Sequence, residues 1–307
     1  MKLNVLISVG LFVATTGVAN AQLPELKTAQ QTIDSLLKNK PFDYTTYVQT
    51  IERSRESVVR LIAADSLRTA DDYYVASVLA DDPSGFFEAR RVQHELALVA
   101  LVLGHPEAIK RVALTWDGLN WSFGRGQRLG SYKRDNVPVN MDPAPAPEIV
   151  RNVFNDVAAA RKRADAASNN LELEQIRNAD QADREGDITP EMQLRMQKND
   201  PPRRDRVLEM IKAGTPVTGR DFHNASLVLQ HGNGFEAYRL AHELAVAAVA
   251  LGDTTATWLL SRTYDRMLLH LGHRQRMNTQ SGGPRGALLP VDSTAVNARI
   301  RATLGSK

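Results

Sequence analysis

Residues 87–104 read FEARRVQHELALVALVLG, and residues 235–252 read FEAYRLAHELAVAAVALG. Both stretches lie in an ungapped match between residues 87–131 and 235–279, in which 17 of 45 positions are identical. Apolar residues recur three and four positions apart in each copy, a spacing typical of an amphipathic helix. The sequence therefore predicts two copies of one helical unit, 148 residues apart.

The ends of these helices are also marked. Gly104 and Gly252 follow the apolar runs, and glycine readily takes the left-handed conformation of a helix C-terminus. A second helix is expected after each glycine, so that 87–123 and 235–271 form equivalent helix pairs. The likeness continues upstream one residue out of step, where Asp72 corresponds to Asp221. Each copy should therefore supply at least three or four helices.

The fold class is predicted to be all-α. Aromatic residues make up only 6% of the chain, and no alternating run of β-branched residues is bounded by hairpin turns. Helix pairs of this kind resemble those of tetratricopeptide-like proteins. Because the period of 148 far exceeds the roughly 34 to 47 residues of helical solenoid repeats, two tandem domain copies are expected rather than an array of short units.

The N-terminus is predicted to be a cleaved signal peptide covering residues 1–21. Lys2 precedes an uncharged apolar stretch, and Ala19-Asn20-Ala21 is a typical cleavage signal. The mature protein should begin at Gln22 and be exported, either to the periplasm or out of the cell. No later segment approaches the length of a membrane span.

The expected domains follow from the repeat and from proline. Residues 22–137 should form copy one and residues 148–307 copy two, joined by a proline-rich linker at 138–147. Copy two is expected to open with one or two polar helices over 148–181. Thr189-Pro190 is a typical helix start, with a capping hydroxyl before a proline at the first helical position.

Composition excludes several classes of protein. The chain holds 38 Lys and Arg against 35 Asp and Glu, and the basic residues are interleaved with acidic ones, so a nucleic-acid partner is not expected. It has no cysteine, which excludes a thiol nucleophile, a disulfide framework and a cysteine-ligated zinc site.

Several polar motifs in the second copy resemble those of a family of bacterial proteins of unknown function. The motifs are ADQ-x-DR at 179–184, QHG at 230–232, and DR at 265–266 followed by Q-x3-TQ at 275–280, with Asn278 where the family has Gly. The resemblance spans residues 171–280 and implies a compact helical domain with a polar cluster. It implies no reaction, substrate or cofactor.

The first copy lacks most of these motifs. Gly118 replaces Arg266, Asp81-Asp82 replaces Gln230-His231, and no ADQ-x-DR element precedes it. Copy one is therefore expected to be a degenerate partner, in which the place of the polar cluster is apolar or simply filled.

Metal and cofactor chemistry are not expected. His242-Glu243 begins like a zinc-protease motif, but Val246 stands where the second histidine is required. His231, His242, His270 and His273 could still converge, although the last two sit near a helix end, where imidazole often only meets free carbonyls. The sequence has no G-x-S-x-G elbow and no dinucleotide fingerprint.

The candidate site is a cluster of six side chains in the second copy. They are Asp183, Arg184, His231, Asp265, Arg266 and Gln275, to which His242 and Gln280 are added as binding residues. The same aspartates and arginines could equally form a structural network of ion pairs.

Two functions are compatible with such a cluster. The first is an exported helical-repeat binding module whose ligand is a peptide, a glycan or a protein. The alternative is a metal-independent hydrolase or lyase of cell-envelope material, in which Asp183 or Asp265 is the base and Arg266 and His231 orient the substrate.

Overall fold

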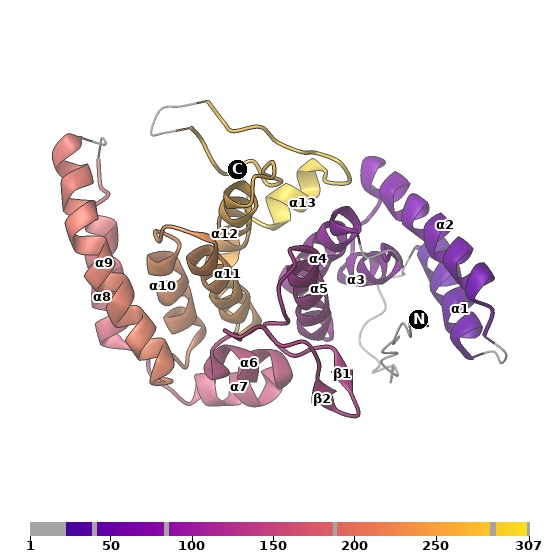
Figure 1. Cartoon of the computed structure of the whole chain (residues 1–307), viewed down its shortest axis with the longest axis horizontal. Coiled ribbons are helices and arrows are strands. Elements are labelled where there is room, and N and C mark those ends of the chain that lie inside the picture. Colours follow the sequence, from indigo (N-terminus) through magenta and orange to yellow (C-terminus); the bar gives the residue numbers. More distant parts are fainter. Residues whose placement is uncertain (1–22, 39–41, 83–85, 187–188, 283–286, 306–307) are drawn as a thin grey trace.

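The computed structural model describes residues 23–38, 42–82, 86–186, 189–282 and 287–305, so the expected signal peptide at 1–21 lies outside the described residues. The chain forms thirteen α-helices within those ranges (Figure 1). They are α1 (Pro24–Lys38), α2 (Tyr44–Ala63), α3 (Ala70–Leu79), α4 (Phe87–Val102), α5 (Ala108–Ser122), α6 (Glu148–Asn155), α7 (Val157–Asp165), α8 (Leu171–Ala182), α9 (Pro190–Lys212), α10 (Gly219–Leu229), α11 (Phe235–Ala250), α12 (Thr257–His270) and α13 (Ala298–Thr303).

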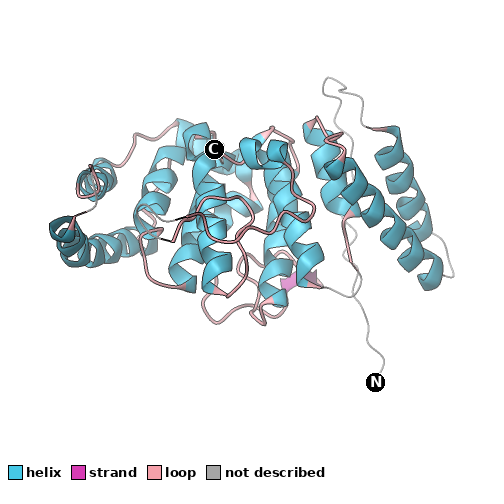
Figure 2. Cartoon of the chain, turned by 90° about the horizontal axis from the view of Figure 1, so that it is seen from above, coloured by secondary structure: helices cyan, strands magenta, loops and turns pink. Residues whose placement is uncertain are grey.

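The prediction of an all-α fold is confirmed. Strand structure in the described residues is limited to one short hairpin, β1 (Lys133–Arg134) paired with β2 (Val137–Pro138), and to a few isolated bridges (Figure 2). None of the helices in the described ranges is long and apolar enough to cross a membrane.

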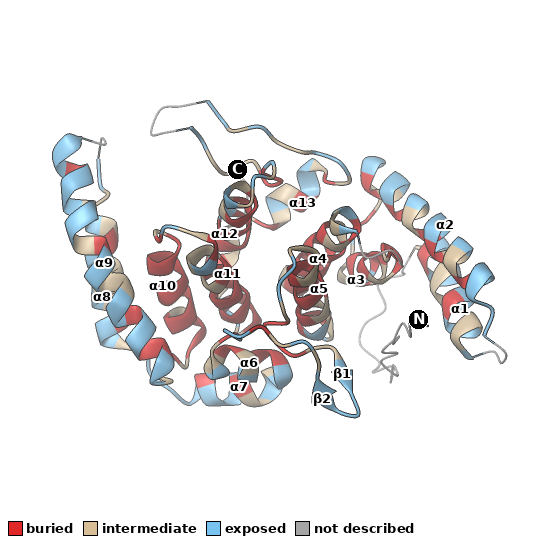
Figure 3. Ribbon diagram, viewed as in Figure 1, coloured by how far each residue is buried: buried red, intermediate tan, exposed pale blue. Residues whose placement is uncertain are grey.

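Helices α4 and α11 lie at the centre and have the predicted bounds. Each runs for 16 residues from the phenylalanine of its motif, and Leu96 and Leu244 at their centres are fully buried. Gly104 and Gly252 follow with φ of +86° and +96°, the left-handed conformation expected at a helix end. We call α3–α5 the first helix set and α10–α12 the second helix set; both are mostly buried (Figure 3).

Each helix set begins with the same capping arrangement. The Thr69 hydroxyl accepts a hydrogen bond from the Asp72 amide, and the Asp72 carboxylate accepts one from the Thr69 amide; Thr218 and Asp221 repeat this pattern. The second carboxylate oxygen of each aspartate also accepts the backbone amide of Leu23 or Asn170. These bonds attach the helix pair α1–α2 to the first helix set and the pair α8–α9 to the second, at opposite ends of the molecule (Figure 1).

Residues 148–181 form three helices rather than the one or two that were expected. Asp156 and Asn170 cause the breaks, because each caps the next helix with its side chain, α7 and α8 respectively. The helix start at Thr189-Pro190 is confirmed, since the Thr189 hydroxyl accepts the amide of Met192. Helix α13, which Asn297 caps, is the last helix of the described residues.

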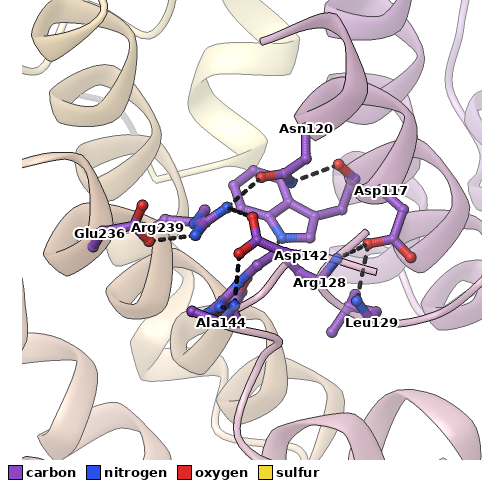
Figure 4. A network of polar contacts seen from close by, with 10 residues as sticks. Asp117, Asn120, Arg128, Leu129, Asp142, Ala144, Glu236 and Arg239 are labelled. Carbon is purple, nitrogen blue, oxygen red and sulfur yellow. Dashed lines mark hydrogen bonds and ion pairs between the residues drawn. The ribbon is translucent and has the colours of Figure 1, made fainter. Parts of the chain in front are cut away.

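The segments after α5 and after α12 cross to the opposite helix set. Helix α6 packs on α11 of the second set, and α13 packs on α4 of the first. Two buried arginines hold these crossings: Arg239 of α11 donates to Asp142 at 3.0 Å (Figure 4), and Arg91 of α4 donates to Asp292 at 2.7 Å. The stretch expected to be a linker therefore makes tertiary contacts at Asp142.

Candidate functional site

Two buried ion pairs connect the helix sets reciprocally. Arg128, after α5, donates from Nε and Nη2 to the two Glu243 oxygens, both at 2.8 Å. Arg276, after α12, donates in the same way to Glu95, both at 2.7 Å. All four side chains are at most 5% exposed. Although burial lowers the pKa of each arginine, the facing carboxylate outweighs it and raises the net pKa of both.

Asp265 fastens the loop that carries Arg276. Its carboxylate accepts the backbone amides of Arg276, Met277 and Thr279, at 2.7 to 3.0 Å, and also the Thr279 hydroxyl. Burial raises the pKa of Asp265, and these donors partly oppose the rise. Asn278 completes the turn at φ +63°, a conformation that asparagine tolerates where glycine is usual. Asp117 makes the equivalent contacts to the loop after α5 (Figure 4).

Gln275 is a second fastener of the same loop. Its amide donates to the carbonyls of Gln280 and Leu289, and its oxygen accepts the Gln280 amide. Gln127 plays the same part in the first loop. Asp265 and Gln275 are both fully buried. Their polar atoms are therefore taken up by these contacts with the backbone.

His242 lies at the interface of the helix sets and meets its own counterpart. Its Nε2 is 3.1 Å from Nε2 of His94, and both imidazoles are at most 1% exposed. Nδ1 of His94 lies 3.1 Å from the Thr115 hydroxyl, and Nδ1 of His242 lies 3.0 Å from the Thr263 hydroxyl. Two neutral rings satisfy this geometry only as opposite tautomers, one donating from Nε2 and the other accepting. Burial lowers the pKa of His242 to about 3 and also lowers that of His94.

The other candidates gather beside the turn between α10 and α11. His231 binds the Asp180 carboxylate through Nδ1 at 3.1 Å, and Arg184 binds the same carboxylate at 3.0 Å. Arg266 donates to the carbonyl of Gln230 and, at 3.1 Å, to the Gln280 side chain. Burial lowers the pKa of His231; Asp180 opposes this, while Arg184 and Arg266 add to it. We call Asp180, Arg184, His231, Arg266 and Gln280 the turn cluster.

Asp183 stands at the edge of this group. Its carboxylate accepts hydrogen bonds from Asn199 at 2.8 Å and Arg203 at 2.7 Å, which lower its pKa. The expectation of one six-residue cluster is therefore not met. Arg184, His231 and Arg266 lie together, and Asp265 and Gln275 fasten the loop. Asp183 pairs with Arg203 of α9, and Arg184 also pairs with that helix through Asp200 at 2.5 Å.

The remaining histidines do not join the turn cluster. His273 stacks on Phe87 with ring centroids 4.2 Å apart, and His270 lies edge-on to Tyr238. The four histidines considered as convergent thus have separate neighbours.

The first helix set has a different arrangement at the matching place. A side chain at Gly118, the counterpart of Arg266, would meet the Tyr132 hydroxyl at 2.9 Å and Arg90 at 3.3 Å. Tyr132 is itself the counterpart of Gln280. The place of the Arg266 side chain is thus filled in the first set, as expected for a degenerate copy. Nearby, Arg55 pairs with Asp82, the counterpart of His231.

Asp180, Arg204 and Gln230 were not among the predicted site residues, although the sequence singles out Asp180, with Asp183 and Asp265, as a carboxylate that could act as an acid or base. Asp180 lies within the ADQ-x-DR motif, but only the fold shows that His231 and Arg184 share its carboxylate. The motif itself was the available signal for Asp180. The available signal for Arg204 was its match to Arg55 in the first copy; it reaches the turn from α9 and donates to the His231 carbonyl at 3.2 Å.

Comparisons with protein-family models, curated proteins and solved structures found no match to this chain.

Proposed function

We propose that the protein is an exported helical binding module and that the turn cluster is its ligand-binding site. One observation carries this proposal. The polar residues that both helix sets share, such as Glu243, Asp265, Gln275 and Arg276, are occupied in holding loops and helix sets together. His231, Arg266 and Gln280, whose counterparts in the first set are Asp82, Gly118 and Tyr132, gather instead with Asp180 and Arg184 at the turn cluster.

Exposure also favours binding at the turn cluster. The side chains of His231 and Arg184 are 15% and 18% exposed, so solutes can reach them, whereas His242 and Asp265 are at most 1% exposed. A peptide, a glycan or a protein segment offers the donors and acceptors that such a surface would take.

The geometry gives less support to the alternative of a hydrolase or lyase. The residues proposed for catalysis were Asp183, His231, Asp265 and Arg266, and each is hydrogen-bonded to a different partner. A general base and its orienting groups need to converge on one reacting atom.

The binding site is tested by co-sedimentation with purified peptidoglycan, a polymer that carries both glycan and peptide. We expect the wild-type protein to sediment with it and the His231→Ala/Arg184→Gln variant to lose at least about tenfold in affinity, since charged hydrogen bonds are the strong ones. Arg206→Gln, an exposed change on α9, is the control. Soluble fragments released by the wild type would instead support the hydrolase.

We further propose that the two helix sets are tandem copies of one domain. The ungapped repeat supports this, and so do the reciprocal pairs Arg128–Glu243 and Arg276–Glu95, in which the two arginines are 148 positions apart and so are the two glutamates. The first copy then serves as a degenerate partner that completes the core of the second.

Export is proposed from the N-terminal sequence alone. We expect the processed protein to begin at Gln22, because Ala19-Asn20-Ala21 is a suitable cleavage site. Mass spectrometry of protein recovered from outside the cytoplasm measures this directly; a chain retaining Met1 or Lys2 there would contradict it.

A further inference from the structure

Two arginines at the turn between α10 and α11 have no carboxylate partner among the described residues. Arg266 donates to the Gln230 carbonyl and to Gln280, and Arg204 donates to the neighbouring His231 carbonyl at 3.2 Å. Both are half-buried. Burial lowers the pKa of Arg266, and the nearby Arg262 and Arg184 lower it further. Among the described residues neither guanidinium is paired with a carboxylate, so an external anion could pair with both.

The first helix set provides an internal comparison. There the matching turn carries Asp81 and Asp82, and these pair with arginines: Asp82 with Arg55, the counterpart of Arg204, and Asp81 with Arg90 at 3.4 Å. In the second set the two aspartates are replaced by the neutral residues Gln230 and His231. The second set therefore keeps the arginine, as Arg204, but lacks the carboxylate that pairs with it in the first set.

The Gln230 side chain is a further sign of an unfilled site. It is 2% exposed, and its Oε1 has no hydrogen-bond partner among the described residues. A buried polar atom without a partner costs about 1 to 3 kcal/mol, which a bound group can recover. Because the oxygen and nitrogen of an amide are assigned from their contacts, this side chain can present either a donor or an acceptor to a ligand.

An ordinary structural role for the arginines is helix capping, since both bind carbonyls at the end of α10. The partial charge of a helix C-terminus is about −0.5 of an elementary charge. Two guanidinium groups exceed it several-fold, so capping alone does not neutralise the two arginines.

We infer that Arg204 and Arg266 form an oxyanion site at this turn, which takes a carboxylate or phosphate group of the ligand. This inference rests on the proposed binding function. The planar guanidinium fork matches both anions. Gln230 and Gln280 flank the site and supply uncharged hydrogen-bonding groups.

Isothermal titration calorimetry of the purified protein at low ionic strength tests the inference, with inorganic phosphate and succinate as probes. We expect saturable binding of at least one probe, and the stronger one identifies the anion. Arg266→Gln and Arg204→Gln should each weaken it about tenfold. Gln230→Asp, which restores the carboxylate of the first set, should abolish it because the ligand then meets a like charge.

The matched control is Arg55→Gln, the counterpart of Arg204, which should leave the affinity unchanged. Thermal melting of each variant establishes that it is folded. If Arg266→Gln does not fold, the variants Gln230→Asp and Arg204→Gln test the inference in its place. Saturable binding that none of these three changes weakens would overturn the inference. If neither probe binds while the protein still sediments with peptidoglycan through His231 and Arg184, the oxyanion site is refuted and the binding function stands; if both fail, both are refuted.

Discussion

Replacing Arg276 with methionine should lower the free energy of unfolding by about 3 to 5 kcal/mol, because it leaves the Glu95 carboxylate buried and unpaired. Arg276 is fully buried and donates twice to that carboxylate at 2.7 Å. It also donates to the Asp292 carbonyl. Urea denaturation followed by circular dichroism measures the loss.

Two further variants show that the loss comes from the orphaned charge. The double variant Glu95→Leu/Arg276→Met should recover most of the stability, since a buried ion pair can often be replaced by apolar groups of similar volume. Arg206→Met on the exposed face of α9 should change little, because exposed ion pairs contribute little. Equal losses for Arg276→Met and Arg206→Met would contradict this account of the interface.

Acidification should destabilise the protein through the histidine pair at the interface of the helix sets. A histidine in the unfolded chain titrates near pH 6.5, whereas burial lowers the pKa of His242 to about 3 and also lowers that of His94. The unfolded chain therefore binds more protons below about pH 6.5, and the free energy of unfolding falls by up to about 1.4 kcal/mol per pH unit for each histidine. Stability is fully present above pH 6.5 and is lost toward pH 3.

The double variant His94→Leu/His242→Leu isolates this contribution. Burial also lowers the pKa of His105, His223 and His231, so part of the pH dependence should remain. Urea denaturation at pH 7.5 and pH 5 should give a difference at least about 2 kcal/mol larger for the wild type than for the variant. The same pH dependence in both proteins would show that the pair does not carry the effect.

The central helices were the most predictable part of the fold. Their apolar spacing and terminal glycines are local signals, and α4 and α11 begin at the expected phenylalanines. The three-way division of 148–181 was missed because Asp156 and Asn170 act as caps through single hydrogen bonds, and aspartate and asparagine also occur in many other places.

The contacts between helix sets were not predictable from local pattern. Glu95 and Arg276 are 181 positions apart, and nothing in either segment shows that they pair. Asp265 and Arg266 are adjacent in the sequence and were therefore placed in one cluster. Neighbours on a helix point about 100° apart, so Asp265 faces the loop after α12 while Arg266 faces the turn between α10 and α11. The contact between His242 and His94 could have been predicted from the repeat, since a residue at the interface of two copies can meet its own counterpart.

We propose that the turn cluster binds ligand while the polar residues shared by both sets only hold the fold. The most direct measurement is the ¹⁵N–¹H spectrum of the arginine Nε groups during titration with soluble peptidoglycan fragments. We predict that the signals of Arg184 and Arg266 shift and saturate while those of Arg128 and Arg276 stay in place. Fragments that bind and leave Arg184 and Arg266 unmoved, or that shift Arg128 and Arg276 equally, would contradict it.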